Sequence, residues 1–239
     1  MSTRQAVQDS ISVFSKTFSY LQQSKMQSTN IEDLKKNWAD DILNSIGVEL
    51  KIIGAVSDNS SMLFLGNHIS YLDIPVLMSA INKLSFVAKE ELRMWPMFGT
   101  AAKKIDTVFV NRNNRGSRLT AKENIEAAIK NGKRIAIFPS GTTCMTESKI
   151  WRNGAFKIAR NTNCFVQPFR MSYSKMRTAA YIDKDFFPLH LLKLCGSAGL
   201  TATLEFHEPI RILDAEVDCK KWQSWSRGLI PRDEFYELN

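Results

Sequence analysis

The stretch MLFLGNHISYLDIP (residues 62–75) joins an apolar run, a polar turn and the start of a helix. Its first four residues, Met62–Leu65, have the length and composition of a short strand. His68 and Asp73 follow this strand closely, and His68 is one of only three histidines in the chain. The organisation of the rest of the chain decides whether this His–Asp pair belongs to a site.

Short apolar runs of the same kind recur after Gly54. Helical patterns separate several of them, notably Ser117–Asn131, which Gly132 closes, and Gly154–Arg160. Strands that alternate with helices predict an α/β fold, with a mixed, mainly parallel sheet flanked by helices. The expected strands are Met62–Leu65, Ser85–Ala88, Thr107–Val110, Ile135–Phe138, Phe165–Phe169 and Thr201–Phe206.

Polar residues follow three of these expected strands, at the point where each strand ends. They are His68, Arg112 and the turn Ser140-Gly141-Thr142. In open α/β sheets, ligands bind at the carboxyl ends of the strands. The order of the chain therefore predicts one site that contains all three groups.

The first 50 residues carry two amphipathic helical patterns, and Asn30 is a suitable cap for the second. We expect an N-terminal amphipathic helical hairpin over residues 1–50, followed by a second domain over residues 51–239. The apolar faces either cover the body of the protein or meet lipid, and the sequence leaves both alternatives open. These faces consist of Val7, Ile11, Phe14, Phe18 and Leu21, and of Ile31, Leu34, Trp38, Ile42 and Ile46.

The composition is that of a globular protein with a basic surface. The chain has 239 residues, of which 44% are hydrophobic and 23% charged, and its net charge is +8. Such a charge suits nucleic acid, an anionic membrane surface or anionic substrates. The basic residues are spread along the chain and form no recognisable nucleic-acid-binding module, so we expect no nucleic acid partner.

The N-terminal residues and the cysteines predict where the protein acts. Residues 1–25 contain no continuous apolar run, so we expect neither a signal peptide nor a transmembrane segment. The four cysteines are widely spaced and match no metal-ligand pattern. We therefore expect free thiols, no metal site, and a cytoplasmic protein that is peripheral to a membrane.

His68 and Asp73 can meet only if the chain turns between them. Five positions on one ideal helix are about 140° apart, which rules out a contact within a single helix. Either Ser70 and Asp73 form a capping box, or the helix begins at Asp73 with Pro75 in its first turn. In both cases the carboxylate faces the loop of His68, where it would fix the imidazole tautomer and make the other ring nitrogen a better base. The alternative is an exposed histidine beside an aspartate that only caps a helix.

The segment NHISYLD (residues 67–73) resembles the N-H-x-x-x-x-D motif of the glycerolipid acyltransferases, the 1-acylglycerol-3-phosphate acyltransferase family. Three further blocks resemble that family in the same order, from about Trp38 to Pro209. FVAKEELRMWPMFGTAAKKIDTVFVNR (86–112) leads to its F-x-x-R block, IAIFPSGTT (135–143) resembles F-P-E-G-T, and FVQPFRMS (165–172) resembles a later strand.

The resemblance implies that residues 51–239 form an acyltransferase domain. Such a domain moves a fatty acyl group from acyl-CoA or acyl-carrier protein to the hydroxyl of a lysolipid, with no bound cofactor. His68 would be the general base and Asp73 would orient it, while Arg112 and Lys89 would hold an anionic headgroup or phosphate. Backbone amides of Ser140, Gly141 and Thr142 would stabilise the oxyanion of the thioester. The first candidate acceptor is 1-acylglycerol-3-phosphate, which gives phosphatidic acid at the cytoplasmic face of a membrane.

Three positions depart from the family pattern, and each departure removes a charge. Ser140 replaces the Glu of F-P-E-G-T, Thr143 stands where Arg is common, and Asn111 stands where Asp is frequent. Another lysolipid such as lyso-ornithine lipid is therefore an alternative acceptor, and a non-catalytic lipid-binding protein on the same fold is a second alternative. Ser140 as the nucleophile of a hydrolase is disfavoured, because F-P-S-G-T is not the G-x-S-x-G elbow.

Overall fold

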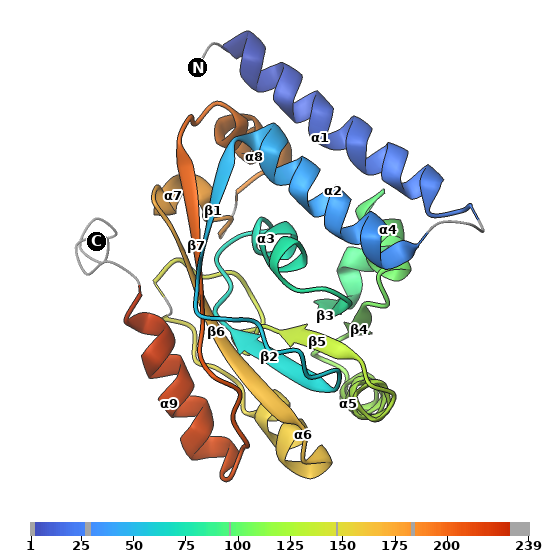
Figure 1. Cartoon of the computed structure of the whole chain (residues 1–239), viewed down its shortest axis with the longest axis vertical. Coiled ribbons are helices and arrows are strands. Elements are labelled where there is room, and N and C mark those ends of the chain that lie inside the picture. Colours follow the sequence, from blue (N-terminus) through green and yellow to red (C-terminus); the bar gives the residue numbers. More distant parts are fainter. Residues whose placement is uncertain (1–2, 27–29, 96, 147, 183–184, 230–239) are drawn as a thin grey trace.

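A seven-stranded sheet forms the centre of the protein (Figure 1). The computed structural model describes residues 3–26, 30–95, 97–146, 148–182 and 185–229. The strand order is β1-β7-β6-β2-β5-β3-β4, and all neighbours are parallel except β6 and β7. This confirms the mixed, mainly parallel α/β sheet. The strands are β1 Val48–Ile53, β2 Met62–Gly66, β3 Leu84–Lys89, β4 Val108–Val110, β5 Arg134–Ile137, β6 Phe165–Tyr173 and β7 Leu200–Phe206.

Helices cover both faces of the sheet and enclose one apolar cluster on each side. In Figure 1, α5, α6 and α9 lie on one face, and α2, α3 and α8 lie on the other. The helices are α1 Thr3–Gln23, α2 Ile31–Ile46, α3 Asp73–Ala80, α4 Phe98–Lys104, α5 Arg115–Lys130, α6 Gly154–Thr162, α7 Met176–Ala179, α8 Phe187–Cys195 and α9 Ala215–Arg227, with a 3-10 turn η1 at Glu90–Met94.

The expected strands agree with the structure, but β1 was not among them. This edge strand pairs with β7 alone and leaves most of its side chains exposed, so it has no continuous apolar run. The boundary expected at residue 50 falls inside β1, because the hairpin ends at Gly47, whose left-handed backbone (φ 74°) terminates α2. The division of the chain into two domains stays a prediction.

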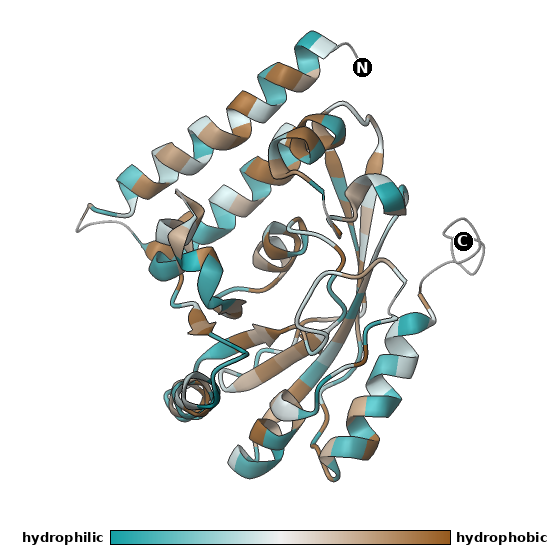
Figure 2. Ribbon diagram, turned by 180° about the vertical axis from the view of Figure 1, so that it is seen from behind, coloured by the Kyte–Doolittle hydropathy of each residue, from teal (hydrophilic) through white to brown (hydrophobic). Residues whose placement is uncertain are grey.

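The N-terminal hairpin exists, and its two helices differ in what they cover. Asn30 caps α2 as expected by accepting a hydrogen bond from the Glu32 amide. The apolar face of α2 packs into the core, where Ile42 is 4% exposed. The outer helix α1 alternates apolar and polar residues (Figure 2) and leaves Ile11 60% and Phe18 58% exposed. None of the helices in the described segments is long and apolar enough to cross a bilayer.

Gly66, the last residue of β2, generates a first testable prediction. A Cβ atom here would lie 2.4 Å from both the ring and the carbonyl oxygen of Phe169 on β6. We expect Gly66→Ala to lower the free energy of unfolding by roughly 1–3 kcal/mol, because overpacking forces the two strands apart. Urea denaturation followed by circular dichroism measures this change.

Gly154→Ala is the matched control, since nothing lies within 4 Å of its added Cβ. We expect its unfolding free energy to stay within about 0.5 kcal/mol of the parent protein. Equal midpoints for the two variants would contradict the close approach of β2 and β6 at Gly66.

Candidate active site

Asn67 fastens the loop after β2 to the neighbouring strand β6. Its buried side chain donates from Nδ2 to the Met171 carbonyl (2.8 Å) and accepts at Oδ1 from the Met171 amide (2.7 Å). Strand β2 pairs with β6 only as far as Gly66 and Phe169, so the side chain of Asn67 takes over where backbone pairing stops. The start of the next segment is thereby fixed to the sheet.

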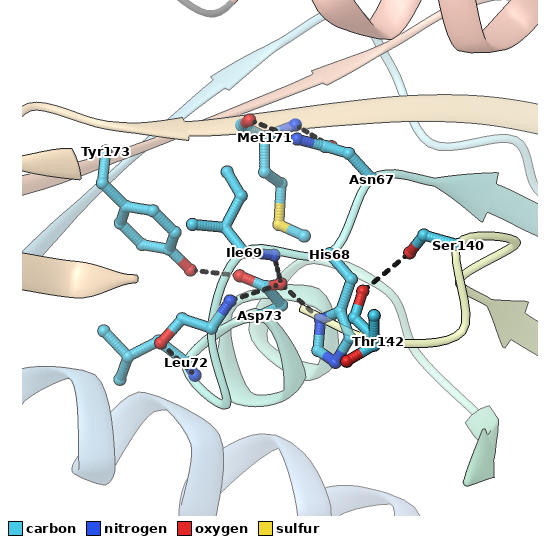
Figure 3. Close-up of polar contacts among 10 residues, drawn as sticks. Asn67, His68, Ile69, Leu72, Asp73, Ser140, Thr142, Met171 and Tyr173 are labelled. Carbon is cyan, nitrogen blue, oxygen red and sulfur yellow. Dashed lines mark hydrogen bonds and ion pairs between the residues drawn. The ribbon is translucent and has the colours of Figure 1, made fainter. Parts of the chain in front are cut away.

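Asp73 begins α3, with Pro75 in the first helical turn, and the helix has no side-chain cap. The second of the two expected arrangements is therefore confirmed. The Asp73 carboxylate is fully buried, and its Oδ2 accepts from the amides of Ile69 (2.7 Å) and Ser70 (3.1 Å). The same oxygen lies 2.7 Å from Nδ1 of His68 (Figure 3). The carboxylate thus turns back into the loop, as the sequence predicts.

These bonds determine how the imidazole of His68 can act. A carboxylate oxygen can only accept, so Nδ1 carries the proton that it donates to Asp73. The ring also stacks on Phe138, with centroids 4.0 Å apart and planes inclined by 12°. Its side chain is 19% exposed, and the ring borders a cavity. The Nε2 lone pair is left as the basic position of the ring.

A cavity of about 750 Å³ brings together most of the residues expected at the site. His68, Lys89, Arg112, Gly141 and Thr142 all line it, and they lie at or after the ends of four different strands, β2, β3, β4 and β5. The remainder of the wall is largely apolar and comes from the hairpin, η1, α4 and α8. Its residues include Val13, Leu34, Trp38, Ile42, Leu92, Trp95, Phe98 and Phe187.

The turn after β5 uses two of its polar groups for hydrogen bonds within itself. Ser140 is buried, and its hydroxyl donates to the Thr142 carbonyl (2.8 Å), so this side chain stays inside the turn. The Gly141 amide donates to the Phe138 carbonyl (2.9 Å), so it is already engaged inside the turn. The expected use of backbone amides of Ser140, Gly141 and Thr142 as oxyanion donors stays a prediction. Because the Gly141 amide is engaged inside the turn and Thr142 lines the cavity, we take the Thr142 amide as the first candidate.

Arg112 lies directly against Gly141. A Cβ at Gly141, whose φ is +73°, would stand 2.5 Å from a guanidinium nitrogen of Arg112, so only glycine permits this approach. Burial lowers the pKa of Arg112, nearby Arg152 lowers it further, and Glu91 opposes the shift. No carboxylate in the described part of the chain forms an ion pair with this half-buried cation. The site therefore offers a positive charge that an anionic ligand would stabilise.

The other two histidines play no part in this arrangement. His190 is buried, and its ring nitrogens are bonded to the Tyr71 hydroxyl (2.9 Å) and the Ala180 carbonyl (2.8 Å). His207 is exposed and packs its ring against Trp222. Within the described residues, no group of three or more His, Cys, Asp or Glu side chains could hold a metal ion, and all four cysteines are free and buried.

Two residues of β6 that contact Asn67 and Asp73 were not predicted from the sequence. The Tyr173 hydroxyl donates to Asp73 Oδ1 (2.6 Å) across 100 residues, and the Met171 backbone holds Asn67 across 104 residues. The sequence signal for Tyr173 was that the strand pattern continues past Phe169. This pattern does not indicate that the Tyr173 hydroxyl contacts Asp73.

Comparisons with known proteins agree with this architecture. The family model described as Acyltransferase matches residues 30–172. A lyso-ornithine lipid O-acyltransferase of Pseudomonas aeruginosa is 30% identical over 182 residues, which cover 74% of this chain and 69% of that protein. A 1-acyl-sn-glycerol-3-phosphate acyltransferase of Neisseria gonorrhoeae is 34% identical over 84 residues, covering 35% of this chain and 32% of that protein.

A solved structure has the same fold. The crystal structure of the 1-acyl-sn-glycerophosphate acyltransferase PlsC from Thermotoga maritima superimposes with a TM-score of 0.71. The match covers 100% of this chain and 99% of that chain, at 18% sequence identity. The sheet and its flanking helices are therefore those of this known fold.

The bond between Asn67 and β6 can be tested by substitution. Asn67→Leu keeps the number and branching of the side-chain heavy atoms but leaves the buried amide and carbonyl of Met171 without partners. We expect the free energy of unfolding to fall by about 2–4 kcal/mol, because each unsatisfied buried group costs about 1–3 kcal/mol. Urea denaturation measures the change.

Asn161→Leu, on the exposed side of α6, serves as the control. A surface substitution of this kind changes stability by no more than about 0.5 kcal/mol. An Asn67→Leu protein that unfolds at the same urea concentration as this control would exclude the bracing role of Asn67.

Proposed function

This chain belongs to the acyltransferase family, and from that premise we propose that its cavity transfers a fatty acyl group from a thioester to the hydroxyl of a lysolipid. The observation that carries the proposal is the pair formed by the buried Asp73 and His68, whose ring borders a largely apolar cavity. An apolar wall suits an acyl chain, while the basic nitrogen suits activation of a hydroxyl.

The proposed reaction needs one base and no covalent intermediate on the protein. His68 Nε2 takes the proton of the acceptor hydroxyl as that oxygen forms a bond to the thioester carbonyl carbon. The carbonyl becomes an oxyanion, for which the Thr142 amide is the proposed donor. The carbon–sulfur bond then breaks, and the imidazolium returns its proton to the departing thiolate. Asp73 stabilises the positive charge of His68 between these two steps.

We assign the anionic part of a substrate to Arg112, with Lys89 as a second cation at the same cavity. The planar guanidinium can bind two oxygens of a phosphate or carboxylate at once. The lowered pKa of Arg112, caused first by its burial, supports this assignment, since an anion beside it would offset the cost of burying the charge.

Two acceptors fit this proposal. Arg112, which forms no ion pair with the residues that the structure describes, favours the phosphate of 1-acylglycerol-3-phosphate, the first candidate from the sequence. The uncharged Ser140 and Thr143 and the likeness to lyso-ornithine lipid acyltransferases favour lyso-ornithine lipid. The acyl donor in either reaction is acyl-CoA or acyl-carrier protein.

We further propose that the protein acts at the cytoplasmic face of a membrane, as a peripheral protein. The exposed Ile11 and Phe18 on α1 and Met94 in η1, which is 83% exposed, supply apolar contact with lipid. The net charge of +8 adds attraction to an anionic surface.

The central test uses purified protein with lipid vesicles that contain lysophosphatidic acid or lyso-ornithine lipid, and with each acyl donor in turn. Mass spectrometry identifies the product. We expect one diacyl product, and we expect His68→Ala to reduce its rate by about 10²–10⁴-fold, as loss of a general base does. His207→Ala, at an exposed histidine outside the cavity, should keep the parental rate. A parental rate in His68→Ala would refute the mechanism. If the parent protein forms no product with either donor, the result would favour the non-catalytic lipid-binding alternative.

The role of Arg112 is tested by Arg112→Gln, which removes the charge and the planar fork. We expect the KM of the anionic substrate to rise by about 10–100-fold with a smaller change in kcat, because a hydrogen bond to a charged group contributes about 1.5–3 kcal/mol. Arg115→Gln, at an exposed position in the first turn of α5, is the control. Unchanged KM values for both substrates in Arg112→Gln would remove this residue from the binding site.

A further inference from the structure

Tyr173 lies behind the His–Asp pair, on the side of Asp73 that faces away from His68 (Figure 3). We propose that Tyr173 is a positioning residue, which holds the Asp73 carboxylate in place and thereby keeps the His68 imidazole aligned for proton transfer. The role of His68 as a base belongs to the function proposed above, so this inference rests on that function.

The two oxygens of Asp73 are served by different parts of the chain. Oδ2 accepts from His68 and from two amides of the adjoining loop. Among the described residues, Tyr173 is the one donor to Oδ1, at 2.6 Å. Without this bond a buried carboxylate oxygen would have no partner, and the carboxylate would gain by rotating about its Cβ–Cγ bond. Such a rotation would change the contact between Oδ2 and the imidazole.

The Tyr173 hydroxyl stays protonated in its buried environment, so it can donate a hydrogen bond. Tyr173 is 3% exposed, and burial together with the charge of Asp73 raises its pKa far above the ordinary value of a tyrosine. The hydroxyl therefore keeps its proton throughout the physiological range of pH. A donor that keeps its proton favours one orientation of the carboxylate that it faces.

Strand β6 makes this contact rigid. Beyond Phe169 the strand has left β2 and pairs with β7, with Tyr173 opposite Ala202. Two residues before Tyr173, the Met171 backbone holds Asn67 through two hydrogen bonds. The short segment from Asn67 to Asp73 is therefore tied to β6 at both of its ends. The sheet, and not the loop, sets the position of the base.

Tyr173→Phe removes the hydroxyl and keeps the ring, so it isolates the hydrogen bond. We expect kcat to fall by about 10–100-fold, while the KM values of donor and acceptor stay within about twofold, because neither substrate touches this buried side chain. A fall in binding with unchanged kcat would contradict the proposal.

A double-mutant cycle with Asp73→Asn separates positioning from general stability. If Tyr173 acts through the Asp73 carboxylate, Tyr173→Phe should cost little further activity in the Asp73→Asn background. If the substitution costs the same factor in both backgrounds, Tyr173 has only a structural role and the proposal fails.

Nitrogen NMR of protein labelled with ¹⁵N-histidine gives a readout that needs no turnover. The chain has three histidines, so the signals of His68 can be identified as those lost in His68→Ala. At a pH where the ring is neutral, we expect the parent protein to hold His68 as the Nδ1–H tautomer. Tyr173→Phe should shift it toward a mixture of both tautomers. If the protein proved to have no acyltransferase activity, this measurement would still test the contact between Tyr173 and Asp73.

Gln167→Leu is the matched control on the same strand. Gln167 is fully buried, and its side chain bonds to backbone groups of Ala55, Ser57 and His207, away from Asp73. We expect this variant to be less stable, yet to keep the parental kcat per folded molecule and the parental tautomer of His68. An unchanged tautomer and kcat within twofold in Tyr173→Phe, or an equal disturbance in Gln167→Leu, would overturn the proposal.

Discussion

The structure of the site depends on one buried carboxylate. Asp73 lies in the apolar interior, where an unpaired charge would be very costly, and it is compensated by four hydrogen bonds. The donors come from the loop after β2 and from strand β6, so the charge can be satisfied only when the loop, the helix α3 and the sheet are all in place. One of these four hydrogen bonds comes from His68. The bonds that stabilise the buried charge therefore also orient the imidazole, which borders the cavity.

Two glycines permit close packing around the cavity that the imidazole borders. Gly66 lets β2 and β6 pack tightly just before the His68 loop, and Gly141 lets the guanidinium of Arg112 lie on the turn after β5. The cavity that results has a basic, polar end at the edge of the sheet. Its apolar part is built largely by α1, α2, α4 and α8, so the helical hairpin covers the domain and also forms part of the site.

Local sequence patterns predicted the alternating strands and helices. They did not predict features that depend on neighbouring parts of the fold. β1 escaped because an edge strand with one neighbour needs no continuous apolar run. The sequence also did not indicate that the turn after β5 uses the Ser140 hydroxyl and the Gly141 amide for its own hydrogen bonds. Which polar groups a turn consumes depends on its backbone dihedral angles, and residue types alone do not fix these.

The sequence by itself determined the strand–turn–helix unit, the spacing that turns Asp73 back to His68, and the sheet edge at which Arg112 and the turn after β5 meet them. These features follow from short-range geometry and from the order of strands and helices. Only the tertiary structure decided that Tyr173 and the Met171 backbone brace the segment from Asn67 to Asp73. The physical reason is that β2 and β6 are neighbours in space while their contacts join residues 100 or more positions apart, a pairing set by the packing of the whole sheet.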